Sequence, residues 1–401
     1  MQIRDIEIEF EGDTLTKYGL FALLAWFLID IIELSKRFKI VTVKKRRNRN
    51  NPIKRRKKPF PDYKMCLGIV VIILLGIKRF EKIPRLLHTE TKLAELIGLE
   101  RFFRVATARN FINEFTLWHL RQLDKINMGI LKDFGEATLQ DFPILDIDKS
   151  THSLESKKRE KAVPGFNKKN KGKPCYQWSC GFVREEVVTQ KLHSGKTKAD
   201  CFKYLEEIVL DAQGKLGIDN FIIRSDEGYL SFKTLDFAVN EGHKIVIPTR
   251  YDWVLSQEGN ELDETKWIRY DDKTRLYELG WGKVVSKCQH NFRIILVEKE
   301  QEKIKIRKRK KFYRYAIVTN LSHPLKTEAL YEFYHQRQTI ENFFKESKNP
   351  FNARKMPSQK FRANEAYLHL VVIAYNCFSI FKKNICQATG KENLLKQLKS
   401  S

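Results

Sequence analysis

Hydrophobic residues recur at helical spacing through the first third of the chain and at strand spacing after it. The apolar runs at 19–32 and 66–77 are shorter than the roughly 20 residues that a bilayer-spanning helix needs. We therefore expect two buried helices there, the first within a helix over about 17–37. Residues 62–132 predict several further amphipathic helices. The pattern as a whole predicts a helical N-terminal region over residues 1–135.

One stretch of this region, ATARNFINEFTLWHLRQL, carries aromatic and basic residues at helical spacing. Phe111, Phe115 and Trp118 share one helical face, with Arg109 and Arg121 off it. Small helical domains with basic edges commonly bind DNA, so we assign DNA binding to the N-terminal region.

From about residue 142, short apolar strands alternate with amphipathic helices. FPILDID predicts a strand, DCFKYLEEIVLDAQGKL predicts a helix, and FIIRSDEG predicts a buried strand that ends in a polar turn. Strands followed by helices indicate an α/β sheet with its connections packed on the faces. We therefore assign residues 140–249 to the first part of an α/β core.

The last part of the chain predicts strands and then helices. Residues 250–320 contain alternating segments such as KWIRY, RLYEL and FRIILV, which predict a β-rich insertion. LKTEALYEFYHQRQTIENFFKESKN then predicts one helix up to Asn349, because Pro350 disfavours helix at the residue before it. A final helix is expected over about 363–384. The span 321–401 would thus add a core helix and C-terminal helices.

The charge of the chain indicates its partner. Among 401 residues, 75 are Lys or Arg and 49 are Asp or Glu, for a formal net charge of +26. Such an excess favours nucleic acid, because neutralised phosphates release condensed counterions; an anionic membrane surface is the weaker alternative. The basic arm, defined as residues 44–59, has ten basic residues and no acidic one. We expect it to be a solvated arm that binds DNA phosphates through Arg46, Arg47, Arg55 and Arg56, although a plain linker would read similarly.

The cysteines and the first residues bear on the compartment. The seven cysteines include no Cys-x-x-Cys pair typical of a zinc site. The opening residues, MQIRDIEIEF, lack the basic start and apolar core of a secretory signal. We therefore expect free thiols in a reducing cytoplasm.

Carboxylates at the ends of predicted strands are candidates for a metal site. Asp146 and Asp148 project from one face of a strand, because side chains alternate with period two. Asp226 follows an apolar strand, at the edge where open α/β sheets bind ligands. A helix N-cap is the alternative role for Asp226, and Glu227 is a weaker candidate.

The segment YHQRQTIENFFKESK places four polar residues on one helical face. At about 100° per residue, Tyr334, Arg337, Glu341 and Lys348 fall within an arc of about 60°, beside an apolar stripe. An ordinary surface ion pair between Arg337 and Glu341 is the alternative interpretation.

The motif Y-x-x-R-x-x-x-E-x-x-x-x-x-x-K, together with Asp148 and Asp226, resembles the DDE transposases of bacterial insertion sequences that carry a Tyr-Arg-Glu-Lys signature. The stretches LDIDKSTHS, GFNKKNKGKPCYQ and RSDEGY extend the resemblance over essentially the whole chain. The resemblance implies an α/β fold with an RNase H-like core, in which a mixed sheet is flanked by helices. It also implies a β-rich insertion and an N-terminal helical DNA-binding region.

The resemblance implies catalytic and metal-binding roles for Asp148, Asp226 and Glu341. Two Mg²⁺ ions, which Mn²⁺ can replace, would be the cofactors, since hard cations take oxygen ligands. We add Asp146 to the metal residues, in a supporting position behind the other three.

Contacts with the phosphates of the transposon end are assigned by the resemblance to Tyr334, Arg337 and Lys348, and we add Lys345. Many relatives have Trp directly after the Arg, whereas this chain has Gln338. Stacking on an unstacked base would then need another aromatic residue, and the candidates in the insertion are Trp253, Trp267, Trp281 and Tyr313.

The expected reaction is metal-dependent cleavage at the ends of an insertion sequence, followed by transfer of the 3′ hydroxyl into target DNA. The expected partners are double-stranded DNA with terminal inverted repeats, target DNA and a second copy of the chain, with no membrane, in a bacterial cytoplasm at the nucleoid. Two alternatives stay open: a non-catalytic sequence-specific DNA-binding regulator, and an RNase H-like nuclease that cuts DNA without strand transfer.

Overall fold

The chain divides into two compact units. The computed structural model describes residues 18–19, 21–43, 60–139, 143–156, 158–165, 167, 170–195, 201–252, 254, 262–285, 287–300, 312–321, 325–351 and 353–389. Within its helices, the side chains of Gln338, Thr339, Glu341 and residues 386–389 are not described. The helical unit comprises Met1–Thr138, Leu154–Val163 and Phe343–Ser401. The sheet unit comprises Leu139–Ser153 and Pro164–Asn342.

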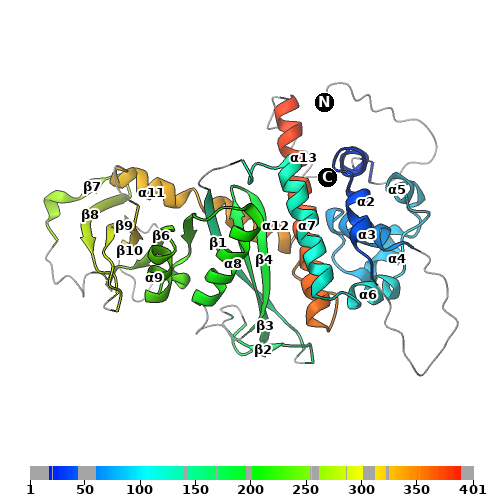
Figure 1. Ribbon diagram of the computed structural model, residues 1–401, viewed down its shortest axis with the longest axis horizontal. Helices are drawn as coiled ribbons and strands as arrows, with labels where there is room; N and C mark the ends of the chain where they lie inside the picture. Colours follow the sequence, from blue (N-terminus) through cyan, green and yellow to red (C-terminus); the bar gives the residue numbers. More distant parts are fainter. Residues whose placement is uncertain are drawn as a thin grey trace. The chain divides into compact units, whose positions relative to one another are not determined.

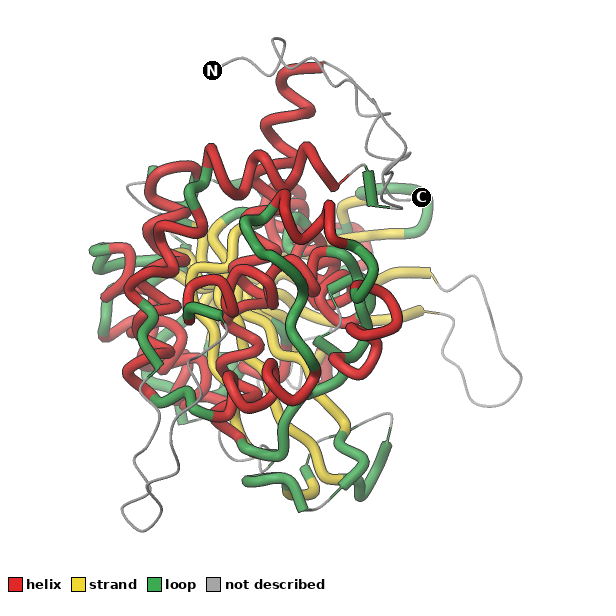
Figure 2. Tube along the Cα trace, turned by 90° about the vertical axis from the view of Figure 1, so that its right-hand side faces the viewer, coloured by secondary structure: helices red, strands yellow, loops and turns green. Residues whose placement is uncertain are grey.

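The helical unit consists of short helices around two long ones (Figures 1 and 2, in which α-helices are coiled ribbons and red tubes). Its elements are α1 (Phe21–Trp26), the π-helix η2 (Phe27–Ile31), α2 (Leu34–Arg37), η3 (Phe38–Ile40), α3 (Asp62–Leu74), η4 (Phe80–Lys82), α4 (Ile83–Leu87), α5 (Thr91–Leu96), α6 (Val105–Asn113), α7 (Leu117–Phe134) and α13 (Phe361–Thr389). Helix α13 packs along α7 and α3 (Figure 1). The side-chain amide of Asn376 on α13 donates to Asn127 Oδ1 on α7 at 2.8 Å.

Apolar helices form the core of this unit. In α3 every residue from Met65 to Ile73 is buried, as expected for a helix that is hydrophobic on all sides. The first apolar run is helical but shorter than predicted, because Glu33 adopts a left-handed backbone with φ 53°. Arg37 Nε binds the Ile32 carbonyl at 2.7 Å at this break. Among the described residues, no helix combines the length and apolar character needed to cross a membrane.

The predicted aromatic face is split between two helices. Phe111 and Phe115 are buried, but Trp118 is 56% exposed. The cause is a break between α6 and α7, where Thr116 and His119 form a capping box that starts a new helix. Trp118, which follows the break, therefore lies outside the buried face that Phe111 and Phe115 share.

A single mixed sheet organises the sheet unit. Its strands are β1 (Ile144–Ser153), β2 (Val163–Pro164), β3 (Pro174–Val183), β4 (Glu186–Ser194), β5 (Ile222–Ser225), β6 (Lys244–Arg250), β7 (Ile268–Arg269), β8 (Thr274–Gly282), β9 (Phe292–Glu300) and β10 (Phe312–Thr319). Among the described residues their order is β2-β3-β1-β5-β6-β10-β9-β8-β7, with β4 also paired to β3. β1, β5 and β6 are parallel to one another, whereas β3, β4 and β7 to β10 pair antiparallel with their neighbours.

Helices cover the sheet. The helical elements of the sheet unit are α8 (Cys201–Leu216), η5 (Glu227–Tyr229), α9 (Phe232–Asn240), η6 (Glu264–Lys266), α11 (Thr327–His335) and α12 (Gln338–Lys348). The last six residues of α12 belong to the helical unit. Helix α8 packs on β4, β3 and β1, and α9 packs on β6 (Figure 1). The mixed sheet flanked by helices, with a helical N-terminal region, confirms the predicted RNase H-like fold class.

A glycine on β3 lets α8 lie close to the sheet. A Cβ at Gly181 would lie 2.8 Å from Ile208 Cγ2 on α8 and 3.3 Å from Leu145 Cδ1 on β1, so a larger residue would push the helix away. The contact also shows which way β1 faces. Leu145 points toward α8, and Asp146 and Asp148 therefore point to the opposite face, because side chains alternate along a strand.

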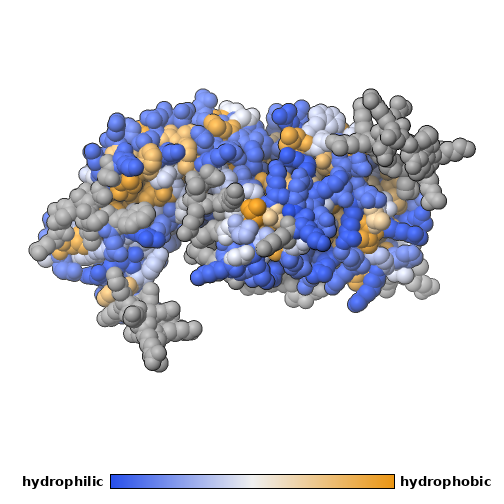
Figure 3. All heavy atoms as spheres, turned by 90° about the horizontal axis from the view of Figure 1, so that it is seen from below, coloured by the Kyte–Doolittle hydropathy of each residue, from blue (hydrophilic) through white to orange (hydrophobic). Residues whose placement is uncertain are grey.

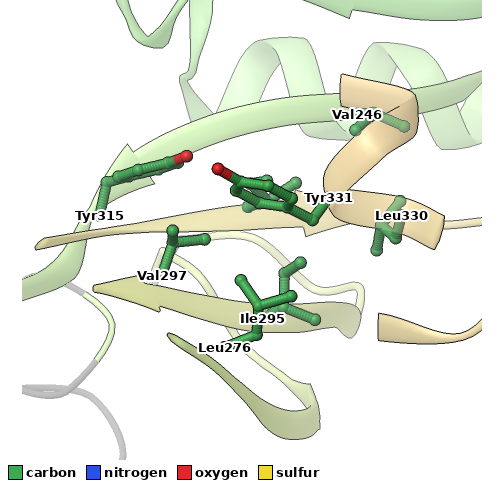
Figure 4. Close-up of a cluster of buried hydrophobic side chains, with 8 residues drawn as sticks. Val246, Leu276, Ile295, Val297, Tyr315, Leu330 and Tyr331 are labelled. Carbon is green, nitrogen blue, oxygen red and sulfur yellow. The ribbon is translucent and has the colours of Figure 1, made fainter. Parts of the chain in front are cut away.

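The region predicted as a β-rich insertion continues the same sheet. β10 pairs with β6 from Tyr315↔Arg250 to Thr319↔Val246, and β9, β8 and β7 follow outward. Helix α11 packs on this extension through one hydrophobic cluster (Figure 4). The cluster consists of Val246, Leu276, Ile295, Val297, Tyr315, Ile317, Leu330 and Tyr331. The extension is therefore the surface on which α11 is held.

The single helix predicted up to Asn349 is wrong, because α11 ends at His335 and α12 begins at Gln338. The Arg337 amide donates to the Tyr334 carbonyl at 3.2 Å, a three-residue step that tightens the backbone at this point. Arg337 is 8% exposed and directed toward β1, so burial of its charged side chain accompanies the break.

Figure 3 draws one face of the molecule. Hydrophilic residues predominate on this face, and hydrophobic residues form smaller groups between them.

Replacing Leu330 with Ala tests how α11 is held. Leu330 is 0% exposed, so Leu330→Ala is expected to lower the free energy of unfolding by about 2–5 kcal/mol, through lost burial and a residual cavity. Leu210 on α8 is 52% exposed, and Leu210→Ala should change stability by less than about 0.5 kcal/mol. Urea unfolding of both variants makes the measurement, and equal effects would contradict the assigned packing.

Candidate active site

Asp148 and Asp226 lie where the pairing of two neighbouring parallel strands ends. The pairing of β1 with β5 ends at Ile147↔Ser225; Asp148 is the next residue of β1, which continues to Ser153, and Asp226 is the first residue after β5. Adjacent strands lie about 4.8 Å apart, so this register places the two residues side by side. They stand at the carboxyl end of β5, the edge at which open α/β sheets bind ligands.

Asp226 is presented to solvent by an anchored turn. It precedes η5, yet within the described part of the chain its side chain makes no capping hydrogen bond, so the N-cap role considered from the sequence is not observed. Tyr229, which is 1% exposed, anchors the turn: its amide donates to the Asp226 carbonyl at 3.0 Å, and Thr234 Oγ1 donates to the Tyr229 carbonyl at 2.7 Å. Glu227 instead pairs with Arg250 at 3.2 Å.

Asp146 forms a buried bidentate pair with Arg224. Arg224 Nε and Nη2 donate to the two carboxylate oxygens, each at 2.7 Å, and both residues are at most 5% exposed. Burial raises the pKa of Asp146, and the opposing effect of Arg224 does not cancel that shift. Both carboxylate oxygens are thus engaged by one guanidinium.

Arg224 also binds the end of α11. Its Nη1 donates to the Phe333 carbonyl, and its guanidinium lies 4.8 Å from the centroid of the Phe333 ring. Sequence analysis missed this residue. The available signal was an arginine inside the apolar strand FIIRSD, since a buried arginine needs an acidic or carbonyl partner.

Arg337 brings a positive charge to Asp148. Its Nη2 donates to the Ile147 carbonyl at 3.2 Å and lies 3.4 Å from Asp148 Oδ1. Burial acts to lower the pKa of Arg337, but the neighbouring Asp148, Tyr334, Asp146 and Asp226 outweigh it and raise the pKa. The guanidinium therefore stays charged within a group of acidic side chains.

Tyr334 is neutral at physiological pH. Burial, opposed by Arg337 and assisted by the charges of Asp226 and Asp148, raises the pKa of Tyr334 to about 12. The residue is partly buried against the cluster beneath α11. The charges of Asp148 and Asp226 thus act on both Tyr334 and Arg337, so these four predicted site residues lie near one another.

Lys149 is a second residue that sequence analysis did not single out. Its Nζ lies 5.0 Å from the centroid of the Tyr229 ring and donates to Cys201 Sγ at 2.9 Å. The ammonium therefore supports the turn that presents Asp226. Its signal in the sequence was only its position after Asp148.

Several predicted site residues fall outside this geometry. Glu341 lies in α12 four residues after Arg337, and its side chain is not described. Lys345 and Lys348 lie in the last turn of α12 and belong to the helical unit. Arg46, Arg47, Arg55, Arg56 and Trp253 lie outside the described residues. Among described side chains, no group of three or more His, Cys, Asp or Glu that could hold a metal is found.

The aromatic candidates in the insertion differ in exposure. Trp281 and Tyr313 are 53% and 54% exposed. Trp267 packs against Tyr277, with ring centroids 5.3 Å apart, and Arg275 lies over its ring at 4.3 Å. Trp267 is thus used in packing, whereas the other two present their rings to solvent.

Removing Arg224 tests the buried pair. Arg224→Met should lower the free energy of unfolding by about 3–5 kcal/mol, because it leaves the Asp146 carboxylate buried and unpaired. Arg250→Met, at an exposed pair, should cost about 0–1 kcal/mol.

The folded state binds the Asp146 proton more tightly than the unfolded state, so stability falls as the pH rises through the raised pKa. Arg224→Met should raise that pKa further, and urea unfolding should show a larger deficit at neutral than at acidic pH; a pH-independent deficit would contradict the pairing.

Comparison with known proteins gives the family. No curated protein matched the chain. The family described as transposase DDE domain group 1 matches residues 4–399, which is nearly the whole chain. Since the match spans both units and agrees with the mixed sheet flanked by helices, this chain belongs to the group 1 family of transposase DDE domains.

Proposed function

We propose that this transposase cuts DNA at the ends of an insertion sequence and joins the freed 3′ hydroxyl to target DNA, using Asp148, Asp226 and Glu341 as its catalytic carboxylates. The observation that carries the proposal is the parallel register that sets Asp148 beside Asp226. Helix α12 adds Glu341 within about one turn of Arg337, and the Arg337 side chain binds Asp148 and β1.

The donor set suits magnesium or manganese. Carboxylate oxygens are the ligands that hard divalent cations prefer, and the exposed Asp226 has no capping bond to break. Asp148, Asp226 and Glu341 would hold the ions. Ions bound there would supply a water nucleophile of lowered pKa and would stabilise charge on the leaving oxygen. The support for this assignment is the chemistry and placement of the residues, together with the family.

The chain's own residues would position the reacting groups. In cleavage, a water oxygen forms a bond to phosphorus, and the bond from phosphorus to the 3′ oxygen breaks, leaving a 3′ hydroxyl and a 5′ phosphate. In strand transfer that hydroxyl attacks a target phosphodiester, and a target 3′ hydroxyl leaves. Arg337 holds Asp148 in place, and the neutral Tyr334 can donate a hydrogen bond to a phosphate oxygen.

Asp146 serves this site from behind. Because both of its oxygens bind Arg224, we propose that it orients β1 and does not ligate metal directly. The set of metal residues that we propose is therefore Asp148, Asp226 and Glu341, supported by Asp146. We also propose that Lys345, Lys348 and the arginines of the basic arm contact DNA phosphates.

Carboxamide variants test the catalytic set. Asp148→Asn, Asp226→Asn and Glu341→Gln should each reduce cleavage of linear DNA carrying the insertion-sequence ends more than about a hundredfold, with binding retained. Glu227→Gln, next to Asp226, is the matched control and should cleave normally. Gel mapping of nicks with Mg²⁺ or Mn²⁺ makes the measurement. A wild-type protein that binds but never cuts would favour the regulator, and one that cuts without joining pre-cut ends to target DNA would favour the nuclease.

Arginine geometry at residue 337 gives a further prediction. Arg337→Lys should reduce the cleavage rate by about 10–100-fold, because one ammonium replaces a planar group that binds both Asp148 and the Ile147 carbonyl. Arg250→Lys, at an exposed site, should cleave like wild type. Single-turnover cleavage rates on saturating DNA compare the two, and equal rates would refute a positioning role for Arg337.

A further inference from the structure

Lys149 lies on the opposite face of β1 from its neighbour Asp148. Side chains alternate along a strand, so Lys149 shares with Leu145 the face that α8 covers. On that face its Nζ donates at 2.9 Å to the Sγ of Cys201, the residue at which α8 begins. The same strand therefore places Asp148 on one side of the sheet and an ammonium on the other.

The ammonium of Lys149 also reaches the turn that follows β5. Its Nζ lies 5.0 Å from the centroid of the Tyr229 ring. A Cβ placed on Gly228 would lie 3.9 Å from this Nζ and 3.9 Å from Asp226 Oδ2. The ammonium and the Asp226 carboxylate thus lie beside the same short turn, and Gly228 keeps the space next to them clear of a further side chain.

The backbone holds this turn through three-residue steps. The amides of Tyr229 and Leu230 donate to the carbonyls of Asp226 and Glu227, each at 3.0 Å. Hydrogen bonds of this kind have poorer geometry than those of an α-helix, and Gly228 adds backbone freedom. The position of Asp226 therefore depends on the side chain that anchors the turn, which is Tyr229 at 1% exposure.

Lys149 links that anchor to the rest of the sheet unit. A cation over an aromatic ring is attracted to it, and more strongly when water is excluded. Lys149 is half-buried, the Tyr229 ring is buried, and α8 packs against η5. One side chain of β1 therefore contacts both the turn, through Tyr229, and the start of α8, through Cys201.

We propose that Lys149 is a positioning residue for the catalytic site: its ammonium links the turn after β5 to β1 and α8, and so sets Asp226 beside Asp148 for binding a divalent cation. The inference rests on the proposed function for the role of Asp226, and it adds a residue that acts through Asp226. Because β1 carries both Asp148 and Lys149, one strand determines the placement of both aspartates.

Hydrogen exchange in the metal-free protein tests this link without using activity. Lys149→Met keeps a side chain of similar length but removes the ammonium. In the full chain with EDTA, the amides of Tyr229 and Leu230 should exchange at least about fivefold faster than in wild type, because the turn opens more readily. Lys149→Arg should exchange close to wild type, since a guanidinium also binds an aromatic face.

Lys191→Met is the matched control. Lys149 pairs with Ser179 between β1 and β3, and Ser179 pairs with Lys191 between β3 and β4, so the two lysines lie in one row on the same face. The Lys191 side chain is 45% exposed, and its Nζ lies 3.9 Å from Glu207 Oε2 on α8. Lys191→Met thus removes the same charge from an exposed ion pair and should exchange like wild type.

Metal binding and cleavage then show whether the turn positions Asp226. Lys149→Met should weaken Mn²⁺ binding to the full chain, measured by the EPR signal of free Mn²⁺, by about 10–100-fold. The Mn²⁺ concentration for half-maximal cleavage should rise equally, while the rate at saturating Mn²⁺ and the DNA affinity in EDTA stay near wild type. Lys149→Arg should recover most of the lost Mn²⁺ affinity. A substitution that only destabilised the fold would not separate these quantities.

The proposal is overturned if Lys149→Met and Lys191→Met behave alike, or if the turn exchanges faster with no change in Mn²⁺ affinity. It is also overturned if Lys149→Met weakens only DNA binding, which would make Lys149 a phosphate contact. If the exchange results are as expected but wild type neither binds Mn²⁺ nor cuts DNA, the proposed function fails and the role of Lys149 in holding the turn stands.

Discussion

The buried pair of Asp146 and Arg224 is the interaction on which the arrangement of the sheet unit depends. Arg224 belongs to β5, its guanidinium binds both oxygens of Asp146 on β1, and its third nitrogen binds the Phe333 carbonyl on α11. Charges removed from water are stable only when their hydrogen bonds are complete. One side chain therefore fixes two strands and one helix relative to each other, within a few residues of Asp148 and Asp226.

The sheet extension supports the same helix from another direction. Strands β10, β9, β8 and β7 continue the sheet outward from β6. Side chains on one face of this extension pack against Leu330 and Tyr331 of α11 (Figure 4). The hydrophobic cluster holds the body of α11, while Arg224 holds its C-terminal end. Tyr334 lies in the last turn of α11 and Arg337 follows two residues after its end, so the approach of Arg337 to β1 is a consequence of how α11 is packed. The insertion is thus part of the scaffold for the candidate active site.

Two buried titratable side chains beside Asp148 stay neutral. Burial, reinforced by the charge of Asp148, raises the pKa of the Cys180 thiol and of the Tyr229 phenol well above their usual ranges, so both stay neutral. Arg337 supplies positive charge at 3.4 Å. A carboxylate next to a guanidinium, beside a second and exposed carboxylate, is an arrangement suited to binding cations and phosphates.

The sequence alone determined most of the elements and the placement of the acidic residues along them. Period-two alternation put Asp146 and Asp148 on one face of a strand, and the polar turn after FIIRS put Asp226 at a strand end, because such patterns are local and survive in any packing.

Only the tertiary structure decided which partner each charge takes. The Asp146–Arg224 pair, the break between α11 and α12 at Arg337, and the exposure of Trp118 all depend on contacts between distant segments or on local capping that competes with helical periodicity. Periodicity defines which face of an element is buried, but the free energy that selects the opposing surface comes from long-range packing and desolvation, which no short stretch of sequence contains.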